Sequence, residues 1–378
     1  MTALDVLFIS GDIGGNVPPT LEIAGELARR GHRVAVAGIR TRPDGIAEAL
    51  LPALADMDVS QNPGRLGHLP NLRRMAMGSA VTRDVRALLA RQRADVVVID
   101  GVMLGSIREA LRSGIPTAVL FHSLGKFWSD GMSNGPLNAL LRPFGLAPRA
   151  LLARTDALLL PTDRDLDPAG RGSSRIAFDW LGTTERGLPP EPRVPGEPLL
   201  VLVSLSTAWQ KKQGDVYRRI IAALGQLAGG DLPVRAIVTT GGAQLDGELS
   251  SLQNVEIRGR FSHAEILPRA DLVIGHGGHS TTLRALAHGV PLLILPLNPT
   301  SDQPMIGKAV ESAGAGRSLS RNATPEEIRD AVLDILTDRA IVATAARTGE
   351  RLRGQRGAEA GADRIEAIAM TPATFRRS

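Results

Sequence analysis

The stretch DVLFISGDIGGNVPPTLEIAGELARRGHRVAVAG, residues 5–38, decides the fold. An apolar run at 5–10 is followed by a glycine-rich turn, a segment at 21–31 with apolar residues at helical spacing, and a second apolar run at 33–38. Neither run shows the polar alternation of a half-exposed strand, so both are typical of strands buried in a parallel sheet. The stretch therefore predicts a strand–helix–strand unit.

The same alternation continues along the chain. Further strands are predicted at 95–100, 117–122 and 156–161, and again at 199–206, 235–241, 271–275 and 291–296. Helices are predicted near 104–113 and from Thr324, where Thr-Pro-Glu-Glu combines a capping box with proline at the first helical position. Residues 40–80 and 123–150 show no clear periodicity, so we expect loops that border a cleft.

The chain is long enough for two domains, because its 378 residues exceed the size at which one hydrophobic core usually stops growing. Five prolines, typical of a stiff linker, are Pro189, Pro190, Pro192, Pro195 and Pro198. We therefore expect two facing Rossmann-like α/β domains with a cleft between them. They are expected at 1–187 and 199–378, joined by a linker at 188–198 about which they close, with a C-terminal helix that can return to the first domain.

The composition excludes several classes of protein. A hydrophobic content of 43% with 22% charged residues is typical of a globular protein, and no apolar run approaches the roughly 20 residues that span a bilayer. The N-terminus lacks a signal-peptide pattern, so we expect a cytoplasmic protein with no stable membrane insertion. The absence of cysteine excludes disulfides, thiolate metal sites and a cysteine nucleophile. Arginines are spread out and aromatic residues are few, so no nucleic-acid partner is expected.

A stretch in the second half, GHGGHSTTLRALAHGVP at 275–291, places glycines and hydroxyl residues where a predicted strand leads into a predicted helix. Glycines let a ligand approach the backbone, and the unpaired amides at a helix start attract anions. The helix dipole adds about 0.3–1 kcal/mol per neighbouring charge. Ligands of open α/β sheets bind beyond the carboxyl ends of the strands. We therefore predict a diphosphate site here, to which Ser206 and Thr207, after another strand end, add hydroxyl groups.

The segment GRFSHAEILPRADLVIGHGGHSTTLRALAHGVPLLILPLNPTSDQP, residues 259–304, resembles the donor-binding signature of the GT-B-fold family 1 glycosyltransferases. It is most similar to bacterial members that decorate natural products such as antibiotics, and the likeness extends over essentially the whole chain. The resemblance implies inverting transfer of a sugar from a nucleotide sugar, bound by the second domain, to a small acceptor bound by the first. No metal is expected, because the helix start and the Ser206–Thr207 loop supply positive potential, and no cofactor besides the nucleotide-sugar co-substrate.

The resemblance also implies roles for individual residues of the second domain. Phe261 flanks the nucleobase, and Asp302 and Gln303 hold sugar hydroxyls. The implied diphosphate contacts are His276, Gly277, Gly278, His279, Ser280 and Thr281. His279 can equally be a helix-surface histidine, which is also our interpretation of His288.

Arg284 departs from the family pattern. Eight residues after the turn histidine, members that use UDP-sugars commonly carry a glutamate, whose carboxylate accepts hydrogen bonds from the ribose hydroxyls. A guanidinium accepts none. A deoxyribose lacks the 2′-hydroxyl, so this substitution favours a dTDP-deoxysugar over a UDP-sugar as donor, unless Arg284 simply points to solvent.

The first domain departs from the family at the position of the catalytic base. The turn after the first strand commonly presents a histidine there, and this chain has Asn16, which cannot take a proton at neutral pH. Asp12 in the same turn and His122 at a strand end are candidate bases, with His68 a weaker one. Asp100, where the family's histidine finds its carboxylate partner, either acts on the acceptor or caps the next helix.

Asn16 leaves other functions open. An acidic phenol or a carbon nucleophile needs little deprotonation and could be glycosylated without a base. A non-catalytic partner protein of a glycosyltransferase would show no turnover with any donor. A nucleotide-sugar 2-epimerase of the same fold would need acid/base carboxylates near the sugar, and a lipid-linked transferase would need a membrane-docking patch. A homodimer is compatible with the sequence, which contains no sign of the oligomeric state.

Overall fold

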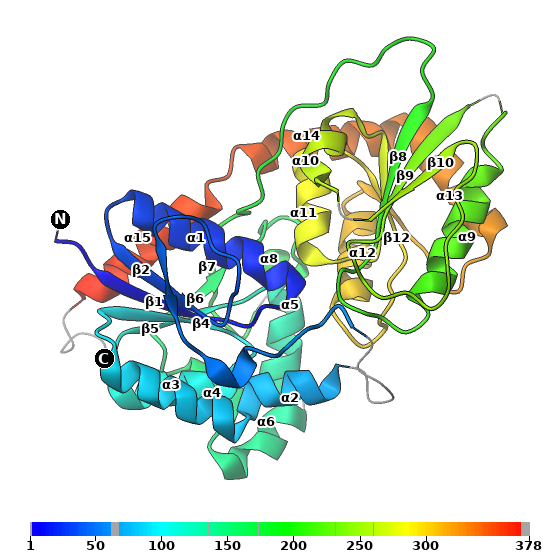
Figure 1. Cartoon of the computed structure of the whole chain (residues 1–378). Coiled ribbons are helices and arrows are strands. Elements are labelled where there is room, and N and C mark those ends of the chain that lie inside the picture. Colours follow the sequence, from blue (N-terminus) through cyan, green and yellow to red (C-terminus); the bar gives the residue numbers. More distant parts are fainter. Residues whose placement is uncertain are drawn as a thin grey trace. The chain divides into compact units, whose positions relative to one another are not determined.

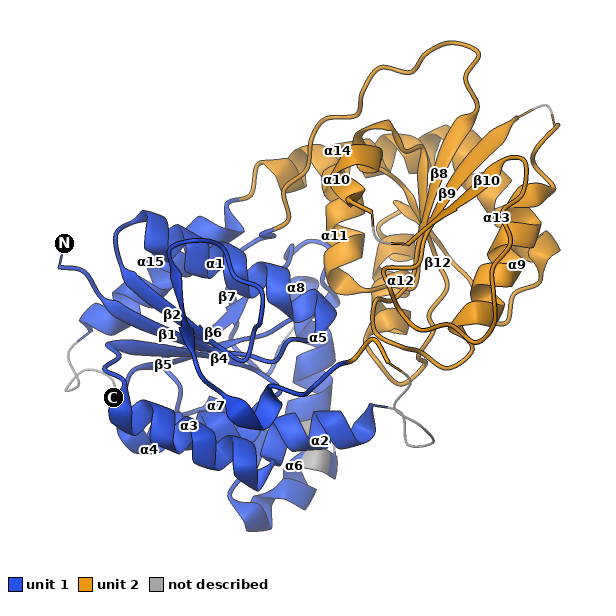
Figure 2. Ribbon diagram, viewed as in Figure 1, with its two compact units in different colours: residues 1–58, 68–184, 356–378 blue, residues 59–67, 185–355 orange. Residues whose placement is uncertain are grey.

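The computed structural model describes residues 2–61, 68–134, 136–172, 174–230, 232–259 and 261–371. The chain divides into two compact units (Figure 2). Unit 1 comprises residues 1–58, 68–184 and 356–378, and unit 2 comprises residues 59–67 and 185–355. None of the helices in the described residues is both long enough and apolar enough to cross a membrane.

Unit 1 is built, in the described part of the chain, around a seven-stranded parallel sheet of order β3-β2-β1-β4-β5-β6-β7 (Figure 1). The strands are β1 (Asp5–Ile9), β2 (Arg33–Ala37), β3 (Ile46–Ala49), β4 (Val96–Asp100), β5 (Thr117–Leu120), β6 (Ala157–Leu160) and β7 (Asp179–Trp180). Because neighbouring strands are parallel, their carboxyl ends lie at one edge of the sheet. Residues that follow β1, β4 and β5 are therefore brought together.

Helices cover both faces of this sheet, because successive side chains of a strand point to opposite sides. Val6 and Phe8 of β1 lie in one core cluster with α1 (Val17–Arg29) and α15 (Gly357–Met370), whereas Leu7 and Ile9 lie in another with α3 (Ser79–Arg91), α4 (Leu104–Ser113) and α7 (Pro148–Leu152). The remaining helical segments are η1 (Gly14–Asn16), η2 (Pro52–Leu54), α2 (Leu69–Met77), α5 (Gly125–Trp128), η3 (Ser129–Asn134), α6 (Pro136–Leu141), η4 (Arg142–Phe144) and α8 (Pro168–Arg171).

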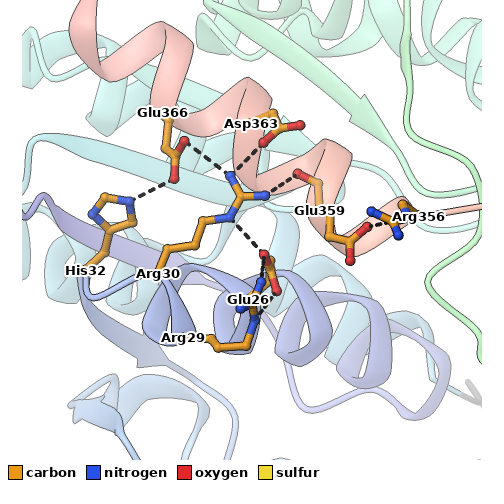
Figure 3. A network of polar contacts seen from close by, with 8 residues as sticks. All are labelled: Glu26, Arg29, Arg30, His32, Arg356, Glu359, Asp363 and Glu366. Carbon is orange, nitrogen blue, oxygen red and sulfur yellow. Dashed lines mark hydrogen bonds and ion pairs between the residues drawn. The ribbon is translucent and has the colours of Figure 1, made fainter. Parts of the chain in front are cut away.

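The last helix, α15, is held on α1 and β2 by a network of polar contacts (Figure 3). Arg30 at the end of α1 donates to Asp363 at 2.6 Å and lies 3.2 Å from Glu366. His32 accepts the Leu4 amide on Nδ1, so its Nε2 carries the proton and donates to Glu366 at 2.9 Å. The buried side of α15 adds Ile365 and its apolar neighbours to the core of unit 1. The C-terminal helix therefore belongs to unit 1 although it follows unit 2 in the sequence.

Unit 2 contains a six-stranded parallel sheet of order β10-β9-β8-β11-β12-β13, again within the residues that the structure describes. Its strands are β8 (Leu199–Ser204), β9 (Val234–Thr239), β10 (Val255–Arg258), β11 (Leu272–Gly275), β12 (Leu292–Ile294) and β13 (Gly316–Ser318). Its helical segments are α9 (Gln213–Gly225), α10 (His263–Ile266), η5 (Leu267–Arg269), α11 (His279–Ala287), α12 (Gln303–Ser312), α13 (Pro325–Thr337) and α14 (Arg339–Arg353). The register places Ser204 beside Gly275, so the loops that leave β8 and β11 are neighbours.

Most of the predicted elements are confirmed. Each of the nine apolar runs contains a strand, namely β1, β2, β4, β5, β6, β8, β9, β11 and β12, and the helix expected at 104–113 is α4. Helix α13 begins at Pro325 with Thr324 as its N-cap, and both hydrogen bonds of the capping box are present, at 2.8 and 3.2 Å. The expected α/β architecture with parallel sheets is therefore present in both halves.

The predictions of loops at 40–80 and 123–150 are wrong in part, because the described residues of these segments include β3, α2 and the short helices η2, α5, η3, α6, η4 and α7. Residues 62–67 and 135 lie outside those residues. Strand β3 lies at the edge of the sheet and has the sequence Ile-Ala-Glu-Ala, which lacks the apolar run of a central strand. The first helix also begins earlier than predicted, at Val17, with two prolines in its first turn.

Candidate functional site

The turn between β11 and α11 contains two glycines, of which Gly277 cannot be replaced by another residue without distortion. Gly277 has φ +83°, and a Cβ on it would lie 2.8 Å from the backbone oxygen of Gln303. A Cβ on Gly278 would lie 2.6 Å from Nε2 of His276, so the imidazole packs directly over this glycine. Gly278 is the N-cap of α11, and no side chain caps the helix there. A glycine N-cap offers no side chain to cap the helix, and the start of a helix attracts anions such as a phosphate.

His276 is buried in this turn as a neutral imidazole. His276 is 9% exposed, and its ring nitrogen Nδ1 has no hydrogen-bond partner among the described residues. Burial lowers the pKa of His276 to about 4, so the ring carries no charge at neutral pH. A neutral imidazole still donates one hydrogen bond, which is what an incoming phosphate oxygen requires. The structure therefore gives His276 the chemistry of a hydrogen-bond donor and not of a permanent cation.

One face of α11 is occupied by a carboxylate from this chain. The hydroxyl of Ser280 donates to Oε1 of Glu185, and Nε of Arg284 donates to Oε2 of the same carboxylate at 2.7 Å. Glu185 is only 6% exposed in its side chain, and that of Arg284 is 31% exposed. Arg284 therefore pairs with Glu185 and does not simply point to solvent. Neither the pair nor Glu185 itself was expected from the sequence.

The Ser206–Thr207 loop follows β8 and is a neighbour of the α11 turn, through the pairing of Ser204 with Gly275. Ser206 is buried; its hydroxyl oxygen accepts the Ala208 amide at 3.1 Å, and Gln213 donates to its carbonyl oxygen at 2.7 Å. Thr207 is exposed. The structure thus leaves the hydroxyl protons of both side chains available at the carboxyl edge of the sheet.

The residues implied to contact the nucleobase and the sugar have clear local partners. Phe261 lies under the guanidinium of Arg258, whose Cζ is 4.4 Å from the ring centroid. Asp302 is the N-cap of α12, without a side-chain cap hydrogen bond. Gln303 is buried, and its Oε1 accepts the amides of residues 297 and 298 at 2.8 and 2.9 Å. Its amide nitrogen is the group that can bind a sugar hydroxyl.

In unit 1, a buried carboxylate lies at the carboxyl end of β4. Asp100 accepts hydrogen bonds from Nδ2 of Asn16 at 2.8 Å and from the hydroxyl of Ser10 at 3.1 Å, both on Oδ2. Its Oδ1 accepts the Val102 amide at 3.0 Å. The N-cap of α4 is Met103, so Asp100 does not cap that helix. Asn16 and Ser10 therefore orient Asp100; Ser10 was missed in the sequence because it merely ends an apolar run.

His122 approaches the same carboxylate from the end of β5. Its Nε2 is 3.7 Å from Oδ2 of Asp100, and neither ring nitrogen has a hydrogen-bond partner among the described residues. Burial lowers the pKa of His122, and the negative charge of Asp100 opposes that effect only in part. The next residue, Ser123, has φ +100°, a left-handed conformation that is strained for a residue with a side chain. Such strain is often found at functional sites.

The other candidate bases lie differently. Asp12 forms an ion pair with Arg40, at 2.9 Å. His68 directly precedes α2, in the segment that the structure describes from residue 68 onward. The structure therefore brings together Asn16, Asp100 and His122 but leaves Asp12 with another partner.

Two stretches with Asp-x-Asp spacing, at 56–58 and 163–167, do not form a metal site. Asp56 pairs with Arg74 at 2.6 Å, and Asp167 accepts the amides of Ala169 and Lys126 at 2.8 and 3.2 Å. Among the described residues, no group of three or more His, Cys, Asp or Glu side chains is arranged to hold a metal ion. These aspartates therefore have structural partners.

Both halves of the chain match models of known families. Residues 223–362 match the Erythromycin biosynthesis protein CIII-like, C-terminal domain, and residues 14–174 match the Glycosyl transferase 4-like domain. Together with the two parallel sheets, these matches make the chain similar to glycosyltransferases of the GT-B fold, although the matched part spans only 37% and 29% of two of the curated relatives.

Among such proteins the chain is related to antibiotic glycosyltransferases. It is 31% identical to demethyllactenocin mycarosyltransferase of Streptomyces fradiae over 47% of this chain and 37% of that protein. It is 24% identical to oleandomycin glycosyltransferase of Streptomyces antibioticus over 93% of this chain and 88% of that protein. The solved glycosyltransferase of kitacinnamycin shares the fold, with a TM-score of 0.76 and 22% identity over 98% of this chain and all of that one.

Proposed function

We propose that the protein catalyses inverting, metal-independent transfer of a sugar from a nucleotide sugar to a small natural-product acceptor. In this proposal unit 2 binds the donor and unit 1 binds the acceptor. The observation that supports it is the turn at 276–280, where Gly277 in a left-handed conformation and a buried, neutral His276 directly precede the start of α11. Such a site suits a diphosphate, which becomes the leaving group and gains negative charge as the sugar departs.

On the acceptor side, we propose that Asp100 and His122 replace the missing histidine. Asn16 and Ser10 hold the Asp100 carboxylate in one orientation through hydrogen bonds of 2.8 and 3.1 Å. Burial lowers the pKa of His122, so the ring is neutral at pH 7 and has a nitrogen free to accept a proton; the negative charge of Asp100 would stabilise the imidazolium that forms. The acceptor hydroxyl would lose its proton to this pair as it attacks the anomeric carbon. Asn16 then positions groups and takes no proton itself.

For the donor, we propose a dTDP-deoxysugar in preference to a UDP-sugar. Arg284 stands where a carboxylate would receive the ribose hydroxyls, and a guanidinium cannot accept hydrogen bonds. A donor without a 2′-hydroxyl loses less from this change. Glu185 pairs with Arg284 at 2.7 Å and brings a carboxylate to that position.

A panel of donors and acceptors tests the activity. The purified chain is incubated with dTDP- and UDP-sugars and with polyphenol and macrolide acceptors, and products are identified by mass spectrometry. We expect at least one acceptor to gain the mass of a sugar, with faster turnover from a dTDP-sugar. Asp100→Asn should lower kcat by about 10²–10⁴ if the pair acts as the base, whereas Asp56→Asn serves as a surface control.

A non-catalytic partner protein is the second candidate, supported by Asn16 and by the burial of both His122 ring nitrogens. It predicts that nucleotides bind while no donor in the panel is turned over. Binding and turnover measured on the same preparation separate the two functions. Turnover of any donor would exclude the partner-protein function.

A further inference from the structure

The carboxylate of Glu185 lies where the donor's diphosphate is proposed to bind. It bridges Ser280 and Arg284, which are four residues apart and hence on one face of α11. Ser280 is in the first turn of α11, where the helix dipole favours a negative group. Resting on the proposed function, we infer that the Glu185 carboxylate competes with the donor for Ser280 and Arg284. When the donor binds, both side chains break their hydrogen bonds to Glu185 and form new ones to the diphosphate.

Hydrogen-bond counting supports competition rather than shared binding. The hydroxyl of Ser280 has one proton, and it is donated to Glu185. The same proton cannot be donated to a phosphate oxygen at the same time. Two negative groups on one turn would also repel each other in a site that solvent screens poorly. Binding of a diphosphate to Ser280 therefore requires this contact to break.

The surrounding charges favour an exchange of partners. Arg284 is the cation that faces Glu185, at 2.7 Å, and the guanidinium is forked, so it suits a phosphate as well as a carboxylate. His263 interacts with Arg284, and His288 interacts with both members of the pair and with Arg353. Burial and nearby guanidinium groups lower the pKa values of both histidines, so neither supplies a cation at neutral pH. When Glu185 moves away, the positive charge of Arg284 therefore becomes available to the diphosphate of the donor.

Glu185 lies at a point where the chain crosses from unit 1 to unit 2. Thr184 ends one part of unit 1, and Glu185 is the first residue after this crossing into unit 2. Further along the segment, the amide of Glu191 donates to the carbonyl of Pro268 at 2.7 Å. Donor binding would therefore act on the residue that directly follows the crossing.

Isothermal titration of dTDP and UDP into the full chain tests the inference. Glu185→Gln keeps the shape of the side chain and removes the charge, so we expect the Kd for nucleotide to fall roughly three- to thirtyfold. Arg284→Ala should raise the Kd. Glu191→Gln is the matched control: it removes a charge from the same segment, where the side chain is 57% exposed and 4.0 Å from its nearest arginine, and should leave the Kd unchanged.

Other outcomes overturn the inference in distinguishable ways. Weaker binding by Glu185→Gln would make Glu185 a ligand of the donor, and an unchanged Kd would make the pair purely structural. If the melting temperature shows that Glu185→Gln does not fold, Glu185→Asp is tested instead. The aspartate side chain is shorter by one methylene group, so its carboxylate does not reach Ser280. No nucleotide binding by the wild type and all variants would contradict the proposed function itself.

Discussion

Asn16 keeps the hydrogen bond to Asp100 that a histidine at this position would make, and it loses the capacity to take a proton. Arg284 is a second residue whose chemical group differs from the one that is common in the resembling family. Arg284 stands where a carboxylate was expected, and the carboxylate instead arrives from Glu185. At the residue scale, Asn16 and Arg284 therefore place different groups at two positions of the proposed site.

The burial of His276 makes the stability of unit 2 depend on pH. The pKa of His276 is about 4 in the folded chain and near 6.5 in the unfolded chain, so protons bind the unfolded chain preferentially between these values. The free energy of unfolding therefore falls as the pH decreases from 6.5 to 4, and this contribution is constant above 6.5. We expect a shallower fall for His276→Asn in urea unfolding measured at several pH values across this window. Equal slopes for both proteins would contradict the burial of a neutral ring.

At the scale of elements, the sequence predicted what lies in the centre of each sheet. Central strands such as β4 are buried on both faces, and their unbroken apolar runs mark them. The edge strands β3, β10 and β13 are half-buried and carry polar residues, so no run marks them. The sequence predicted only that a C-terminal helix can return to the first domain. The contacts of α15 could not be predicted, because its partners at the end of α1 are more than 300 residues away in the sequence.

The docking of α15 gives a prediction for stability. Ile365 is fully buried in the core cluster that α15 shares with α1 and β1. Ile365→Ala removes three buried carbon atoms and should lower the free energy of unfolding of unit 1 by about 2–4 kcal/mol. Calorimetry of the full chain measures this as a lower melting temperature for one of its transitions.

Val342→Ala on α14 is the control for that measurement. The side chain is 41% exposed, so its truncation should change stability by only about 0.5 kcal/mol. An Ile365→Ala variant no less stable than this control would show that α15 does not complete the core of unit 1.

At the scale of the whole molecule, each unit has its own sheet and its own set of functional residues at a carboxyl edge. The glycine turn proposed to bind phosphate could be recognised in the sequence because its residues are contiguous, from His276 to Thr281. The contacts of Asp100 and Glu185 could not, because they join residues 84 and 95 positions apart. A motif of contiguous residues could therefore be recognised in the sequence. Contacts between residues that only the fold brings together could not.

The central claim is that the turn before α11 binds the diphosphate of a nucleotide sugar. Titration of dTDP and UDP into the wild type and into His276→Ala, with circular dichroism to show that both are folded, tests it most directly. The account predicts that the wild type binds nucleotide and that His276→Ala raises the Kd at least about tenfold, the value of one hydrogen bond to a charged group. A folded His276→Ala protein that binds nucleotide as tightly as the wild type would contradict it.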